Sequence, residues 1–71
     1  MPVTPREAVL AVLRDAGEPL HWTVIQDRAL RAEAIDPFEV RDVRGAVLGA
    51  LRELLDDGLV TKTSKGVYAL V

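Results

Sequence analysis

The sequence predicts a small α+β domain: three helices, a C-terminal β-hairpin and a short third strand. Two observations carry this prediction. Apolar residues recur at spacings of three and four between Val43 and Leu55, which is the pattern of one buried helical stripe. Directly afterwards, residues 59–63 and 67–71 form two short runs rich in β-branched and aromatic side chains around a glycine-containing turn, which is typical of a β-hairpin. We expect residues 1–71 to form a single domain.

The first helix is expected to begin with a capping box. Thr4 is followed three residues later by Glu7, and Pro5 takes the first helical position, where its missing N–H is not needed. The helix is expected to end at Gly17, because Pro19 pushes the residue before it toward extended geometry. The residues expected to face inward are Ala8 or Val9, Val12 and Leu13.

Residues 20–22 are expected to be extended and to add a third strand to the hairpin. Thr23 and Gln26 form a second capping box, which opens a helix expected to run to about Ala34. His21 is expected to be half-buried and to bond the backbone at the start of this helix, since no second ligand lies at the spacing of a metal site. We expect Trp22, like Tyr68, to pack in the core or against the hairpin. Ile25, Ala29 and Leu30 are expected to face inward.

A third start signal begins at Asp36 and continues with Pro37. Two interpretations are open: a brief helical turn that breaks before Asp42, or a third helix that is continuous from Pro37. Phe38 and Val40 are expected to be packed in either case.

The third helix is expected to stop at Gly58, because glycine accepts the left-handed conformation common at helix ends. Its predicted buried stripe is Val43, Val47, Leu51, Leu54 and Leu55. Its opposite face carries Asp42, Gly45, Gly49, Arg52, Glu53 and Asp56. The resulting order of helix, short strand, two helices and two strands matches a winged helix-turn-helix.

Composition excludes several classes of protein. Hydrophobic residues make up 49% of the chain, enough for a core, and the absence of cysteine excludes disulfides and thiolate metal sites. No apolar run approaches a membrane span, and no signal-peptide core is present, so we expect a cytoplasmic protein, nucleoid-associated if it binds DNA. No nucleophile elbow, phosphate loop or metal motif occurs. We therefore expect no enzymatic activity, no cofactor, no small-molecule substrate and no membrane partner.

The charge balance opposes the usual function of this fold. The formal net charge is −2, whereas DNA-binding domains usually carry a basic footprint. From Gly58 onward there are two lysines and no acid, while the preceding residues hold seven arginines and eleven acids. The sequence therefore predicts a basic wing on an acidic body.

The sequence also resembles a known family. The resemblance is carried by residues 4–8, by Pro19-Leu20-His21 leading into Ile25 and residues 28–30, by residues 50–54, and by the closing Gly66-Val-Tyr-Ala-Leu. These residues resemble the HARE-type winged helix-turn-helix, which occurs attached to restriction endonucleases and chromatin proteins and is similar to the N-terminal domain of the bacterial RNA polymerase delta subunit. The resemblance implies a DNA-binding or chromatin and transcription role without catalysis.

Two groups of residues are candidates for binding double-stranded DNA. The first lies on the third helix, where arginines at the N-terminal end reach bases or phosphates and glycines permit close approach of the backbone. The second is the wing tip, whose ammonium and hydroxyl groups suit phosphate. The candidates are Arg41, Arg44, Gly45, Gly49, Arg52, Lys62, Thr63, Ser64 and Lys65.

Each candidate has a structural alternative. Arg41 and Arg44 would pair with Glu39 or Asp42 on a solvated surface, the glycines would admit a neighbouring helix, and the wing lysines would protect an exposed sheet edge. Asp42, Glu53 and Asp56 would repel phosphate, so any docking in the major groove must use the first turn of the third helix.

Two functions follow from these observations. The first is a DNA-binding module that places its third helix in the major groove and its wing on phosphates. The second is a protein-interaction winged helix, either a homodimer or a small factor that docks on a DNA-processing machine such as RNA polymerase. The fold favours the first function, and the acidic net charge favours the second.

Overall fold

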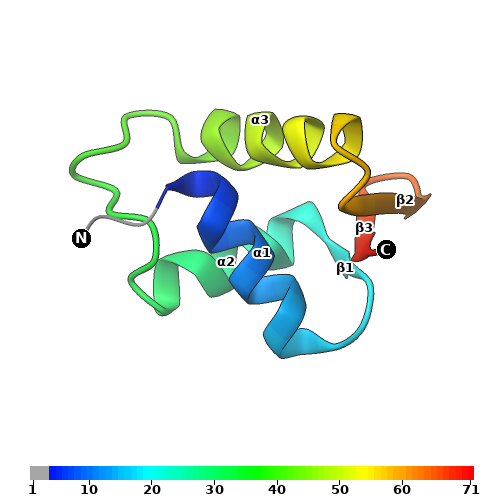
Figure 1. Ribbon diagram of the computed structural model, residues 1–71. Helices are drawn as coiled ribbons and strands as arrows, with labels where there is room; N and C mark the ends of the chain where they lie inside the picture. The colour runs from blue at the N-terminus through cyan, green and yellow to red at the C-terminus, as the bar shows by residue number, and fades with distance from the viewer. Residues whose placement is uncertain (1–3) are drawn as a thin grey trace.

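The computed structural model describes residues 4–71, and its elements follow the predicted order (Figure 1). The three helices pack together, the sheet lies at one end, and the loop between α2 and α3 lies at the other (Figure 1). This arrangement confirms the predicted α+β class and is compatible with a winged helix. The elements are α1 (Pro5–Ala16), β1 (Leu20–His21), α2 (Trp22–Arg31), α3 (Val43–Asp56), β2 (Val60–Ser64) and β3 (Val67–Leu70).

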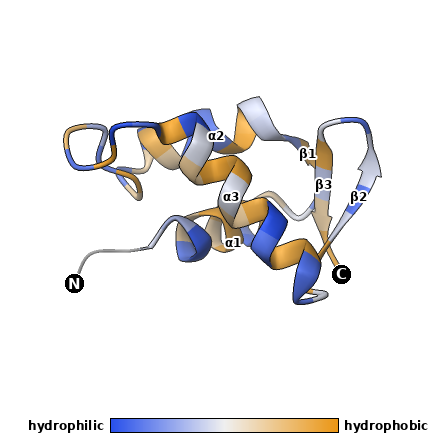
Figure 2. Cartoon of the chain, turned by 90° about the horizontal axis from the view of Figure 1, so that it is seen from above, coloured by the Kyte–Doolittle hydropathy of each residue, from blue (hydrophilic) through white to orange (hydrophobic). Residues whose placement is uncertain are grey.

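The predicted stripe of α3 forms the centre of the core. Val47, Leu51 and Leu54 are fully buried, and Val43 and Leu55 pack at its margin. Figure 2 shows the alternation of hydrophobic and hydrophilic residues along this helix. The inward residues predicted for α1 and α2 also join the core, with Leu30 at its edge; Ile35 and Ala50, which the periodicity did not single out, are buried with them.

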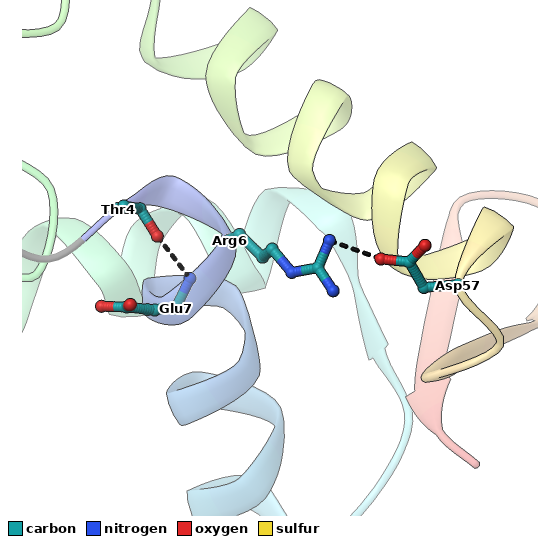
Figure 3. A network of polar contacts seen from close by, with 4 residues as sticks. All are labelled: Thr4, Arg6, Glu7 and Asp57. Carbon is teal, nitrogen blue, oxygen red and sulfur yellow. Dashed lines mark hydrogen bonds and ion pairs between the residues drawn. The ribbon is translucent and has the colours of Figure 1, made fainter.

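The N-terminal cap of α1 forms as predicted. Thr4 Oγ1 accepts a hydrogen bond from the backbone N–H of Glu7 at 3.2 Å (Figure 3). Gly17 closes the helix with a φ of 65°. Arg6 then reaches from α1 to Asp57, the residue after α3, with 2.5 Å between guanidinium nitrogen and carboxylate oxygen (Figure 3). Both side chains are partly exposed, so this pair links two elements while adding little stability.

The start of α2 differs from the prediction. The helix begins at Trp22, and its cap is His21 rather than Thr23: the backbone N–H of Thr23 donates to His21 Nδ1 at 3.2 Å. The cause is tertiary, because antiparallel pairing of His21 with Val67 holds the cap residue extended, and the N–H of Trp22 donates to the carbonyl of Gly66 at 2.9 Å. The predicted backbone bond of His21 is confirmed, but its side chain is exposed rather than half-buried.

The end of α2 also differs, since the helix stops at Arg31 and not near Ala34. Glu33 adopts a φ of 57°, which closes a Schellman motif in which Glu33 N–H donates to Leu30 and Ala34 N–H donates to Ala29. Gly58 ends α3 in the same conformation, as predicted, with a φ of 76°. A residue with a Cβ pays roughly 1–2 kcal/mol for this conformation, so Glu33 occupies a position that suits glycine better.

The segment between α2 and α3 forms a single hydrogen-bonded turn that breaks before Asp42. This is the first of the two structures that the sequence leaves open. The backbone N–H groups of Glu39 and Val40 both donate to the carbonyl of Asp36. Val40 packs against the core as predicted, but the prediction for Phe38 is wrong, because its side chain is 96% exposed. Ile35 and Val40 fill the core at the two ends of the turn, which leaves Phe38 on its outer side.

The sheet has the strand order β1-β3-β2, and both pairings are antiparallel. The register shifts between Lys62 and Ser64, so Thr63 forms a bulge. The hairpin loop is Lys65-Gly66, one residue shorter than expected, because Ser64 already pairs with Val67. Tyr68 is buried, in agreement with its predicted packing role. No helix within residues 4–71 has the length and apolar character needed to cross a membrane.

Candidate nucleic-acid interface

The predicted DNA-binding residues all lie on the surface of the molecule. One group lies on α3 and in the residues just before it, and the other spans β2 and the hairpin loop. A common binding surface requires that the fold bring these two groups close together.

Arg44 is the residue that connects the first turn of α3 to the rest of the site. Its guanidinium carbon lies over the ring of Trp22, 5.1 Å from the ring centroid. A cation this close to an indole face gains roughly 0.5–1 kcal/mol at an exposed position. The stacking restricts the guanidinium and leaves its N–H donors free to bind a further group.

Trp22 in turn is tied to the wing. Its backbone N–H donates to the carbonyl of Gly66, and its indole lies 5.8 Å from the imidazole of His21, measured between ring centroids. A Cβ added at Gly66 would lie 2.7 Å from His21 Nε2, so a larger residue at position 66 would displace the imidazole from the hairpin loop. We refer to Arg44, Trp22, His21, Lys65 and Gly66 as the Arg44–Trp22–wing surface.

The predicted alternative for the arginines does not occur in the part of the chain that the structure describes. Among residues 4–71 the ion pairs are Arg6 with Asp57 and Arg31 with Asp27, so neither Arg41 nor Arg44 pairs with a carboxylate. Asp42 is instead engaged as the cap of α3, where its Oδ1 accepts from the backbone N–H of Gly45 at 2.9 Å. The two arginines therefore keep their charge available to a partner.

The two glycines of α3 have different explanations. A Cβ at Gly45 would lie 2.3 Å from Asp42 Oδ2, so any side chain at this position would displace the cap. Gly49 meets no atom within 4 Å and is open to solvent. Both glycines border a hollow of about 420 Å³ between α3 and the start of α1, lined also by Thr4, Pro5, Arg6, Ala46, Ala50 and Glu53.

Some predicted residues lie outside the Arg44–Trp22–wing surface. Arg52 is exposed about two turns beyond Arg44, among the acids Glu53 and Asp56. Lys62, Thr63 and Ser64 are exposed on the edge strand β2, where Lys62 pairs with Tyr68 across the hairpin. Arg44 is thus connected to the hairpin loop through Trp22, whereas Arg52 lies apart from this surface.

Trp22 and His21 are the site residues that sequence reasoning missed. Trp22 packs against the core as predicted, and the same ring also supports Arg44. The sequence shows an aromatic residue at the strand-to-helix junction, but nothing in it indicates that an arginine more than twenty positions later reaches the same ring. The contact exists because α2 and α3 pack together.

No protein-family model, no curated protein and no solved structure matches this chain. The resemblance to HARE-type winged helices therefore stays a prediction.

Proposed function

We propose that this chain is a winged helix-turn-helix module that binds double-stranded DNA in a transcription-related or chromatin-associated role. The first turn of α3 enters the major groove, and the wing lies on the adjacent phosphates. The observation that carries the proposal is the continuity of the Arg44–Trp22–wing surface. Arg44, which has no carboxylate partner in residues 4–71, stacks on the ring of Trp22, and the backbone N–H of Trp22 donates to the carbonyl of Gly66 in the hairpin loop.

The chemistry of this surface suits nucleic acid. Arginine presents a planar fork of donors that binds phosphate or guanine, and an indole beneath it reduces the conformational freedom lost on binding. Lys65 adds an exposed ammonium at the hairpin loop. Glu53 and Asp56 limit the contact on α3 to its first turn, because both are exposed and would repel phosphates further along the helix, whereas the Asp42 carboxylate caps the first turn.

The test is a fluorescence-anisotropy titration of a labelled mixed-sequence duplex at increasing salt. Arg44 and Lys65 on this surface, with the exposed Arg41 and Lys62 just outside it, predict a log–log slope of roughly −3 to −4 if each of the four neutralises one phosphate. Arg44→Glu and Lys65→Glu should each weaken binding about tenfold or more. Arg14→Glu, on the last turn of α1, changes the net charge equally and should leave the affinity within about twofold.

The control variant distinguishes binding at a defined surface from attraction that depends only on the net charge of the protein. Equal loss in Arg14→Glu and Arg44→Glu would mean that only net charge matters, which contradicts a defined surface. No binding even at low salt would reject DNA as the partner.

A second candidate is a protein-interaction winged helix, either a homodimer or a small factor that docks on a DNA-processing machine. The open face at Gly49 and the hollow beside it favour this candidate. It predicts association that tolerates high salt and is lost when Gly49→Leu fills the hollow. Sedimentation velocity over a range of protein concentrations and salt concentrations tests the homodimer directly.

A further inference from the structure

A second surface lies at the other end of the molecule and plays no part in the proposed DNA binding. The loop between α2 and α3 stands at the end opposite the hairpin in both views (Figures 1 and 2). We refer to residues 33–40 as the Phe38 loop.

Phe38 is the most exposed large hydrophobic side chain among residues 4–71, at 96%. Only Val71, the last residue, comes close, at 84%. The backbone around Phe38 is well bonded: its N–H donates to Asp36 Oδ1 at 2.9 Å, and Val40 N–H donates to the carbonyl of Asp36 at 3.0 Å. The ring is therefore presented on a fixed turn, with a large apolar area left in water.

A hollow of about 440 Å³ adjoins the ring, lined by Leu30, Glu33, Ile35, Asp36, Pro37 and Phe38. Its lining combines apolar side chains from the end of α2 and the loop with two carboxylates. The hollow is large enough for a side chain or two of a partner, and too small for an extended protein interface.

The charge of the loop defines what can enter. Residues 33–40 hold Glu33, Asp36 and Glu39 and no basic residue, which gives the loop a net charge of −3. All three carboxylates are exposed, and none forms an ion pair with another residue between 4 and 71. This charge disfavours nucleic acid as the partner. A symmetric contact with a second copy is disfavoured, because a twofold axis would set each acidic loop against its equivalent.

We propose that the Phe38 loop is a docking site for a short protein segment that carries an apolar side chain flanked by lysine or arginine. The apolar side chain enters the hollow against Phe38, and the cationic groups meet Glu33, Asp36 and Glu39. The left-handed conformation of Glu33 fits this role, since the chain keeps a carboxylate beside the hollow where glycine would be less strained. An affinity on the order of 10 μM is expected for one apolar anchor with a few charge contacts.

The test is selection of a random peptide library displayed on phage against the full chain in the absence of DNA, because basic peptides would themselves bind a duplex. Enriched peptides are then titrated against the full chain and its variants. The proposal expects peptides that combine apolar and basic residues. Their binding should weaken about tenfold in Phe38→Ala and should stay unchanged in Val71→Ala, which truncates the other highly exposed apolar residue.

Glu33→Gly provides a second, independent variant. It relieves the left-handed backbone, so its unfolding midpoint in urea should rise, while its affinity for the basic peptides should fall several-fold because a carboxylate is lost. A weaker peptide complex in a more stable protein cannot be attributed to unfolding.

Several results would overturn the proposal: no enriched peptide, enriched peptides that bind Phe38→Ala as well as the wild type, or acidic peptides. A concentration-dependent dimer that Phe38→Ala abolishes would identify a second copy as the occupant instead. Loss of DNA affinity in Phe38→Ala would assign the loop to the DNA surface. Failure of DNA binding itself leaves this test unaffected, because its readout is the peptide.

Discussion

Two aromatic residues near the two ends of α2 have opposite surroundings. Trp22 starts the helix and packs against the core. Its backbone N–H donates to the carbonyl of Gly66 in the hairpin loop, and Arg44 stacks on its ring. Phe38, in the loop after the helix, is almost fully exposed among three carboxylates. One aromatic residue is half-buried and positions a cation at the surface, whereas the other has almost its whole side chain in solvent. The comparison separates a surface suited to an anionic partner from one suited to a cationic partner.

Truncating these two aromatic residues should give very different losses of stability. Trp22→Ala removes a ring that is half-buried and supports Arg44, so the free energy of unfolding should fall by about 2–3 kcal/mol. Phe38→Ala should change it by less than about 0.5 kcal/mol, since the side chain is exposed. Urea denaturation followed by far-ultraviolet circular dichroism measures both. Equal destabilisation would mean that Phe38 packs against the protein in solution and would remove the contrast.

Replacing two of the glycines with alanine should change the stability by smaller amounts, and the two changes should have opposite signs. Gly66→Ala should destabilise the protein by about 1–2 kcal/mol, because residue 66 has a φ of 76° and its Cβ would strike His21. Gly49→Ala should stabilise it by about 1 kcal/mol, because the helical position is open and alanine favours a helix. Gly58→Ala is the control for backbone strain alone, since its φ is also 76° and no atom lies near.

The difference between Gly66→Ala and Gly58→Ala measures the contact of the hairpin loop with the imidazole. If the two variants lose the same stability, His21 does not hold the loop, and the connection between the wing and Trp22 rests on the single backbone hydrogen bond.

Local chemistry made most of the fold predictable. The cap at Thr4, the stop at Gly58 and the stripe of α3 depend on residues within a few positions of each other, and each forms as expected. The errors lie where distant segments decide the local structure. His21 replaces Thr23 as the cap of α2 because strand β3 pairs with it, and α2 ends early because Glu33 takes a conformation that sequence reasoning reserves for glycine.

The candidate site follows the same division. The exposed positions of Arg41, Arg44 and the wing residues follow from helix and hairpin periodicity. The stacking of Arg44 on Trp22 requires packing of α3 against α2, which no local pattern encodes. The sequence predicts a packed Phe38, but Ile35 and Val40 occupy the core positions on either side of it and Phe38 is left exposed.

We propose that DNA binds the Arg44–Trp22–wing surface and avoids the Phe38 loop. The most direct measurement is an amide and indole chemical-shift titration of the isotope-labelled chain with a short duplex at low salt. The signals of residues 41–45 and 62–66 and of the indole N–H of Trp22 should shift together, while those of residues 33–40 should stay in place. Shifts centred on residues 33–40, or no shifts at any residue, would contradict this proposal.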